Sequence, residues 1–145
     1  MKKNLRDFII QGNYKKAEEI CHNKDMIKIS DAIVAIAYDT SSMSVYSFMR
    51  YMIEKTKDIS WMELAIEVMI HPLCFIEGAY SIALFHAREI LSMQKSLENL
   101  ERILFFYNIP EKLICKKEAL VIADTILNIQ PDNEIALEVR NSNNT

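Results

Sequence analysis

Residues 119–136 read ALVIADTILNIQPDNEIA, and this stretch decides the fold class. The run ending at Ile129 reads as most of a helix that spans about 113–129. A sharp turn over 131–133 follows, because Pro cannot continue a helix and Asp and Asn bond their own backbone. Residues 134–140 then read as a short terminal helix. Two helices joined by a tight polar turn predict helical architecture at this end of the chain.

The other end of the chain carries the same arrangement. Residues 5–9 place apolar side chains at the i, i+3 and i+4 positions of one helix, which Gly12 ends. A second helix begins at Asn13 and carries Tyr14 and Ala17 on one face. A short helix, a tight turn and a second helix predict an αα-hairpin.

The composition of the 145 residues favours helices throughout. The chain has only two Gly and three Pro, whereas a β-sandwich or barrel needs many tight turns built from these residues. Nucleotide sites of the Rossmann and P-loop kinds need clustered glycines, which this sequence lacks. Its formal net charge of −3 argues against general nucleic-acid binding. We therefore expect an all-α protein without direct nucleic-acid contact.

Apolar residues at helical spacing predict further helices over 27–38, 42–56, 60–71, 76–92 and 96–107. Ser42 is expected to cap its helix, Ser60 and Glu63 to form a capping box, and Pro72 to end the helix before it. The second helix of each pair begins near 13, 42, 77 and 113, which gives differences of 29, 35 and 36. This spacing predicts a short α-solenoid of about four antiparallel helix pairs with a C-terminal capping helix. We expect one helical-repeat domain over 1–140 and a polar, frayed tail over 141–145.

Two segments resemble tetratricopeptide repeats. GNYKKA at 12–17 resembles the G-x-Y-x-x-A turn of that family, in which Gly permits the tight turn and Tyr and Ala allow close packing. Residues 119–136 resemble the second helix of a repeat, its closing turn and the start of the next helix. Ala17 and Ala119 lie 102 positions apart, three times the 34-residue period. Tyr51 and Phe85 stand at the positions in phase between them, so the middle of the chain departs from the motif.

A second resemblance covers residues 61–91, with WMELA at 61–65, HPL at 71–73, EGAY at 77–80 and ALFHA at 83–87. Together with NIPEKL at 108–113 and the turn at 131–133, these segments resemble small bacterial immunity proteins of polymorphic toxin systems. In such systems a cell exports a toxin domain and keeps a cognate cytosolic protein that neutralises it. The resemblance implies a protein toxin domain as the partner, such as a basic nuclease, without revealing which.

Carboxylates and histidines on two predicted helices raise the alternative of a metal site. Glu63, Glu67 and His71 share one helix face, and His86 and Glu89 share a face of the next helix. Helical di-metal bundles use Glu-x-x-His on paired helices, whereas this sequence has Glu-x-x-x-His and His-x-x-Glu. A solvated polar stripe with a helix-end histidine accounts for these residues better, so we expect neither a metal nor a cofactor.

Nucleophilic catalysis lacks its usual residue patterns. There is no G-x-S-x-G elbow, and the side chains of Cys21 and His22 diverge on a helix. We expect His22 to cap the end of that helix. Three widely spaced cysteines, Cys21, Cys74 and Cys115, suit neither a disulfide scaffold nor a CxxC site, and we expect three buried, reduced thiols. The sequence therefore predicts a protein that is not an enzyme.

The cellular location is predicted from the first ten residues and from the longest apolar run. MKKNLRDFII at 1–10 lacks the long apolar region of a signal peptide. The longest apolar run, over 32–38, is far shorter than the ~20 residues of a membrane span. We expect a cytoplasmic protein that makes no membrane contact.

Acidic residues concentrate in the middle of the chain. Residues 58–101 carry seven acidic and two basic groups. By contrast, residues 1–57 carry seven acidic and ten basic groups, and residues 102–145 carry six acidic and five basic groups. A carboxylate-rich face steers a basic partner toward it, although exposed helix faces commonly carry Glu. The candidate partner-binding residues are Trp61, Glu63, Glu67, Glu98 and Glu101.

Aromatic residues offer anchors for such an interface, because they carry a large share of binding energy. Tyr38, Tyr107 and the pair at 105–106 are further candidates, but most aromatics of so small a chain should lie in the core. Trp61 opens its predicted helix and is, among the aromatic residues, the best candidate for partial exposure.

These observations predict stoichiometric protein binding: an immunity protein that occludes a cognate toxin domain. The alternative is a tetratricopeptide-like adaptor that binds a peptide or a regulatory protein in the groove of the solenoid. An enzyme with a helical metal site is a third reading.

Overall fold

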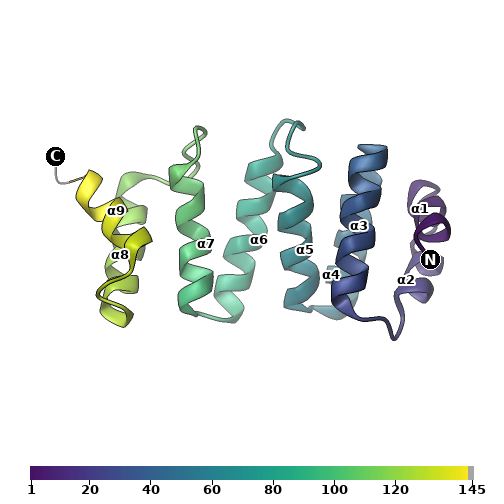
Figure 1. Cartoon of the computed structure of the whole chain (residues 1–145), viewed down its shortest axis with the longest axis horizontal. Coiled ribbons are helices and arrows are strands. Elements are labelled where there is room, and N and C mark those ends of the chain that lie inside the picture. Colours follow the sequence, from purple (N-terminus) through teal and green to yellow (C-terminus); the bar gives the residue numbers. More distant parts are fainter. Residues whose placement is uncertain (144–145) are drawn as a thin grey trace. The chain divides into compact units, whose positions relative to one another are not determined.

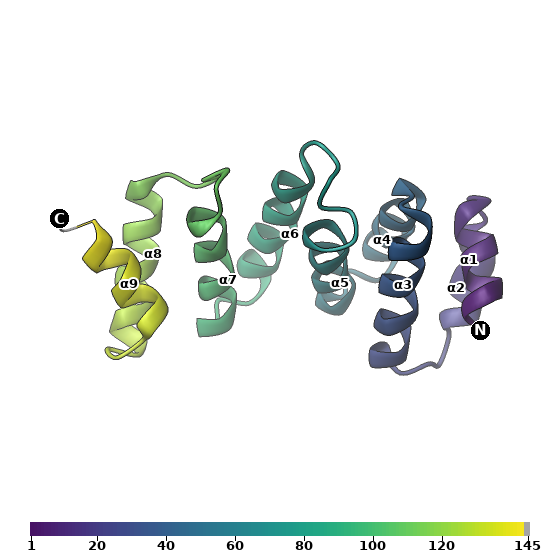
Figure 2. The same cartoon turned by 45° about the horizontal axis from the view of Figure 1, so that its top comes forward.

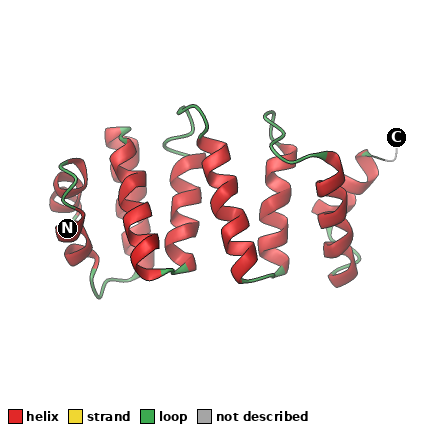
Figure 3. Ribbon diagram, turned by 180° about the vertical axis from the view of Figure 1, so that it is seen from behind, coloured by secondary structure: helices red, strands yellow, loops and turns green. Residues whose placement is uncertain are grey.

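The computed structural model describes residues 1–143, and all regular structure within them is α-helical (Figures 1 and 3). The helices are α1 (Lys2–Ile10), α2 (Tyr14–Cys21), α3 (Met26–Thr40), α4 (Met43–Thr56), α5 (Ile59–Ile70), α6 (Ala79–Met93), α7 (Leu97–Asn108), α8 (Lys116–Ile129) and α9 (Glu134–Ser142). This confirms the all-α prediction and the number and order of helices expected along the described chain.

The chain forms two compact units, Met1–His86 and Ala87–Thr145, and α6 spans the boundary between them. The single domain expected over 1–140 stays a prediction. Of the tail expected to fray over 141–145, residues 141–142 belong to α9, and residues 144–145 lie outside the described residues.

The turn between α1 and α2 has the geometry that the sequence predicts. Gly12 adopts a left-handed backbone with φ +76°, a conformation that glycine reaches without steric cost. The Gly12 N–H donates to the Ile9 carbonyl at 3.1 Å and the Asn13 N–H donates to the Phe8 carbonyl at 2.8 Å. This pair of hydrogen bonds is the Schellman motif, and it turns the chain directly into α2.

Tyr14 and Ala17 hold α2 against the rest of the first unit. Ala17 is fully buried, so the helix backbone comes close to its neighbours. The Tyr14 hydroxyl lies 2.8 Å from Ser44 Oγ on α4, and the Ser44 hydroxyl donates to the Ile9 carbonyl at the end of α1. These side chains therefore connect three helices through hydrogen bonds.

Phe48 on α4 stands at the centre of the first unit and is fully buried. Its ring lies 5.7 Å from Tyr14, 6.2 Å from Tyr51 and 5.9 Å, edge to face, from Trp61. Around it α3, α4 and α5 contact one another (Figure 2). In addition, α1 contacts α3, and α2 contacts α4. Contacts between α1 and α3, α2 and α4, and α3 and α5 thus join helices that are next but one along the chain.

The starts of α5, α6 and α8 differ most from the sequence prediction. The N-cap of α5 is Asp58, two residues before the predicted Ser60, and it accepts from the Ser60 N–H at 2.8 Å. Helix α6 begins at Ala79, after a turn that ends in Gly78 with φ +82°. Helix α8 begins at Lys116 because a hydrogen bond from the Leu113 N–H to Phe106 at 2.9 Å keeps the preceding residues on the end of α7.

The second unit contains α7, α8 and α9, which all contact one another. The predicted turn at 131–133 joins α8 to α9, and Asn133 caps α9 by accepting from the Ala136 N–H at 2.9 Å. The Asn133 amide also donates to Glu101 at 2.6 Å and Gln130 at 2.7 Å. A buried amide with all three bonds ties this turn to α7.

Candidate functional site

The sequence-predicted residues of the first unit lie along α5, with Trp61 near its start and Glu67 near its end. Glu67 is exposed, and Glu63, one turn earlier, is half-buried. Trp61, the best aromatic candidate for partial exposure, is only 6% exposed and lies in the core, as most aromatics of this chain were expected to. Its ring is covered because Phe48 reaches across from α4, a long-range contact that residues near Trp61 do not reveal.

The predicted carboxylates of the second unit lie at the start of α7 and have different surroundings. The Glu98 side chain is 81% exposed, with an oxygen 3.8 Å from Arg102. Glu101 is half-buried and accepts the hydrogen bond from Asn133. Glu98 is therefore available to a partner, whereas Glu101 also supports the fold.

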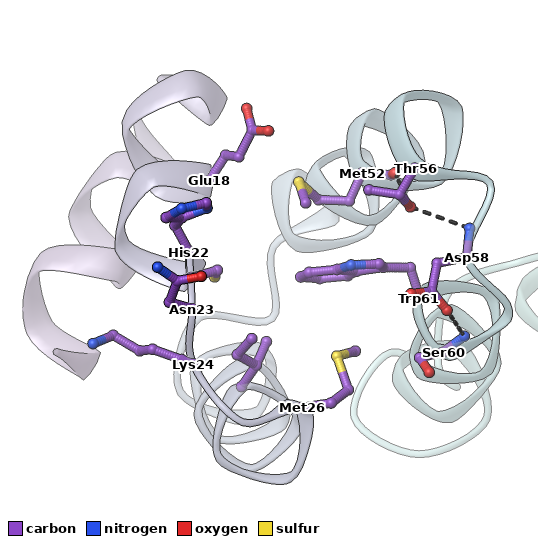
Figure 4. Close-up of a pocket in the computed structure, with 12 residues that line it drawn as sticks. Glu18, His22, Asn23, Lys24, Met26, Met52, Thr56, Asp58, Ser60 and Trp61 are labelled. Carbon is purple, nitrogen blue, oxygen red and sulfur yellow. Dashed lines mark hydrogen bonds between the residues drawn. The ribbon is translucent and has the colours of Figure 1, made fainter.

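A cavity of about 350 Å³ opens in the first unit beside Trp61 (Figure 4). Its apolar wall consists of Cys21, Met26, Ile29, Met52 and Trp61. Its polar lining consists of Glu18, His22, Asn23, Lys24, Thr56, Asp58 and Ser60. The sequence did not predict this cavity, because its lining comes from four helices and the loop between α2 and α3.

One edge of the cavity carries a linked set of polar side chains. Glu18 on α2 accepts from Lys55 Nζ at 2.7 Å and from the Tyr51 hydroxyl at 2.9 Å, both on α4. The hydrogen bond from Lys55 is the main cause that lowers the pKa of Glu18, which is therefore ionised. The same hydrogen bond raises the pKa of Lys55.

A second concave surface lies in the second unit and is mostly apolar. It has a volume of about 480 Å³ and is lined by Leu91, Lys95, Leu100, Cys115, Lys117, Glu118, Val121, Ile122 and Thr125. Val121, one of these lining residues, is 60% exposed. Glu118, one of these lining residues, forms a two-pronged ion pair with Arg88, and this hydrogen bonding raises the pKa of Arg88. We call this surface the apolar groove.

The sequence analysis expected all three cysteines to be buried, but their environments differ. Cys21 is buried, and desolvation raises the pKa of its thiol to about 11. Cys74 and Cys115 are exposed, so the prediction of three buried thiols was wrong for both. Cys115 is the N-cap of α8, where its sulfur accepts from the Glu118 N–H at 3.4 Å.

The residues that raised the alternative of a metal site have separate roles. His86 is fully buried, and its Nε2 lies 2.7 Å from the Tyr46 hydroxyl. His71 and His22 stand at the C-cap positions of α5 and α2, as expected for His22. Within residues 1–143 no three His, Cys, Asp or Glu side chains are grouped so that they could hold a metal ion.

Aromatic exposure also differs from the sequence prediction. Tyr38 is 59% exposed and Phe105 is 39% exposed, whereas Phe106 is fully buried. Phe75 and Phe85, which the sequence analysis did not select as anchors, are 65% and 57% exposed. Exposed aromatic surface in the first unit therefore lies at Tyr38, Phe75 and Phe85 rather than at Trp61.

No helix in the described part of the chain is long and apolar enough to cross a membrane. No protein-family model, no curated protein and no solved structure matches this chain.

Proposed function

We propose that this chain is an immunity protein that binds a cognate bacterial toxin domain and neutralises it by stoichiometric occlusion. It performs no bond-making chemistry, uses no cofactor and acts in the cytoplasm. The proposed scaffold is a short tetratricopeptide-like solenoid of about four helix pairs. The resemblance of residues 61–91 to immunity proteins supplies the class of partner.

The observation that carries this proposal is the excess of carboxylates over residues 58–101, seven acidic against two basic groups. Glu67, Glu77 and Glu98 are exposed in this region. Carboxylates on helix faces attract a basic protein and speed its approach. A basic nuclease domain is a partner of that chemistry, since it must bind phosphate itself.

Helix packing supports the proposed scaffold. Contacts join α1 to α3, α2 to α4 and α3 to α5 in the first unit, and α7 to α9 in the second. Contacts between each helix and the next but one are typical of stacked helix pairs. The Schellman turn at Gly12 and the capped turn at Asn133 stand at the two segments that resemble tetratricopeptide repeats.

Co-expression tests the proposal directly. The C-terminal domain encoded by the gene next to this one would be expressed alone and together with this chain, and growth would be scored. We expect the domain alone to arrest growth and the pair to restore it. Continued arrest, with both proteins soluble, would overturn the assignment.

Charge reversal locates the interface on the partner that rescue identifies. We expect substitution of Glu63, Glu67, Glu98 and Glu101 by Lys to slow association and weaken its salt dependence. Because Glu101 bonds Asn133, a triple variant that keeps Glu101 separates charge from folding. The matched control reverses three exposed carboxylates elsewhere, at Glu111, Asp124 and Glu138. Equal effects of the two triple variants would mean that net charge alone matters.

A second candidate function is a tetratricopeptide-like adaptor for a peptide or a regulatory protein. The apolar groove favours it, because an apolar peptide segment buries its side chains in such a surface. An adaptor would bind an extended peptide with about micromolar affinity, whereas an inhibitor would bind a folded domain far more tightly. Calorimetry with the folded partner and with its excised segments distinguishes the two.

A further inference from the structure

One polar group of the first unit, the indole N–H of Trp61, has no hydrogen-bond acceptor within the described chain. Trp61 is 6% exposed, and no residue in the described chain accepts a hydrogen bond from its indole N–H. No fully buried side-chain nitrogen or oxygen among residues 1–143 lacks a partner, so the indole nitrogen must reach accessible space. The cavity is the space that Trp61 lines. A ligand in the cavity can therefore accept this hydrogen bond in place of solvent.

The wall around this N–H is apolar and adaptable. In Figure 4 Trp61 extends from α5 across the cavity toward His22 and Asn23, with Met52 on one side and Met26 on the other. Methionine side chains are flexible and polarisable, so they adjust to apolar groups of different shapes. The Cys21 thiol in the same wall is neutral at physiological pH, because its pKa is raised to about 11 by burial. These walls favour an apolar occupant.

The charges at the rim favour an occupant without net charge. Glu18 is already neutralised by Lys55, at 2.7 Å. Of the remaining charged residues, Lys24 belongs to the loop between α2 and α3 and Asp58 to the N-cap of α5, on opposite sides of the opening (Figure 4). A charged ligand would meet a like charge on one side, whereas a neutral amide meets a donor and an acceptor.

We propose that this cavity binds one bulky apolar side chain of a protein partner, such as Leu or Phe, whose backbone carbonyl accepts the Trp61 N–H. The inference rests on the proposed function in that the occupant is a segment of the neutralised domain. It adds a neutral anchoring site to the acidic surfaces described above. Desolvated pockets that receive one large side chain commonly dominate the energy of an interface.

The test uses the free protein and small probes, so it does not depend on identifying a toxin. The chain has one tryptophan, and its indole N–H therefore gives one resonance in a nitrogen-15 NMR spectrum. This resonance would be followed during titration with N-acetyl-L-leucinamide and N-acetyl-L-phenylalaninamide. We expect a saturable shift with a Kd of about 1 mM or weaker, as the small size of the probes implies.

Matched probes and variants decide the result. N-acetylglycinamide, which lacks the side chain, should shift the resonance at least tenfold less at equal concentration. Met26→Phe should fill the cavity and abolish saturation, whereas Met43→Phe changes the same residue type at the first position of α4, outside the cavity. Melting curves check that both variants fold.

An absent shift, equal shifts with the glycine probe, or unchanged binding in Met26→Phe would each overturn the anchoring site. Failure of growth rescue with a positive titration would instead overturn the proposed function and leave the cavity as a binding site for neutral apolar amides.

Discussion

The cavity beside Trp61 and the apolar groove are of similar size, about 350 and 480 Å³, but are built differently. The floor of the cavity is part of the core, since Trp61 packs on fully buried Phe48. The floor of the groove is helix surface, where Val121 is 60% exposed. The shape of the cavity therefore depends on how the core packs. The shape of the apolar groove depends mainly on the positions of its helices.

Substitution in the core beneath the cavity should have the largest effect. Phe48→Ala removes the ring that contacts Tyr14, Tyr51 and Trp61, and should lower the free energy of unfolding by about 3–5 kcal/mol. Val121→Ala in the groove should change it by no more than about 0.5 kcal/mol. Urea unfolding measures both. Comparable losses in the two variants would remove the distinction between the two floors.

Thiol chemistry compares the two surfaces directly, because each is lined by one cysteine. The pKa of Cys21 is raised from 9.0 to about 11, so at pH 7–8 its thiolate is roughly 100-fold scarcer than that of an ordinary thiol. Iodoacetamide should therefore modify Cys21 far more slowly than exposed Cys115, with a rate that rises until about pH 11.

Two serine double variants isolate each thiol for this measurement. Cys74→Ser with Cys115→Ser leaves Cys21, and Cys21→Ser with Cys74→Ser leaves Cys115. Similar alkylation rates for the two at neutral pH would show that Cys21 is not held in a desolvated wall.

For the two capped turns, the larger loss of stability is expected in the second unit rather than the first. Asn133 in the second unit is buried and makes three hydrogen bonds, at 2.6–2.9 Å. Asn133→Ala should cost about 1–3 kcal/mol, because it removes the cap and leaves polar partners unpaired. Asn13 in the first unit is exposed and caps α2 through one bond of 3.4 Å, so Asn13→Ala should cost about 0.5 kcal/mol. Thermal unfolding measures both, and equal costs would contradict the assigned role of the buried amide.

The sequence predicted what local chemistry determines. The helices, the Gly12 turn, the Ser42 cap and the ends of helices near Pro72 and Pro131 follow from residues within a few positions. The Ser60 capping box failed because Asp58, two residues earlier, is the N-cap and accepts from the Ser60 N–H, which Glu63 was expected to bond.

The site could be predicted only in part, because exposure and partners are set by distant residues. Trp61 is covered by Phe48 from the preceding helix, and Glu101 is held by Asn133, 32 positions away. The cavity combines α2, α3, α4 and α5, and no single segment of sequence contains its pattern. Glu67 and Glu98 are exposed, as residues on polar helix faces usually are.

The smallest expected effect comes from Glu18 at the edge of the cavity. Its hydrogen bond from Lys55 lowers its pKa below the ordinary value of 4.5. The pair therefore adds stability above pH 4.5, and that contribution is lost as the pH falls through the lowered pKa of the folded state. Glu18→Gln should destabilise the first unit slightly at pH 7, and its difference from the unaltered protein should shrink in acid. Both side chains of the ion pair are partly solvated, which keeps the effect small.

Glu19→Gln is the matched control, because Glu19 is exposed on the same helix and the described chain gives it no ion pair. Urea unfolding at pH 7 and at pH 3 should show a pH-dependent loss for Glu18→Gln and none for Glu19→Gln. A loss for Glu18→Gln that is the same at both pH values would mean that Glu18 acts through its uncharged hydrogen bond with Tyr51, at 2.9 Å, rather than through the ion pair. In that case the rim of the cavity would no longer be neutralised by Lys55, and the preference for an uncharged occupant would lose one of its supports.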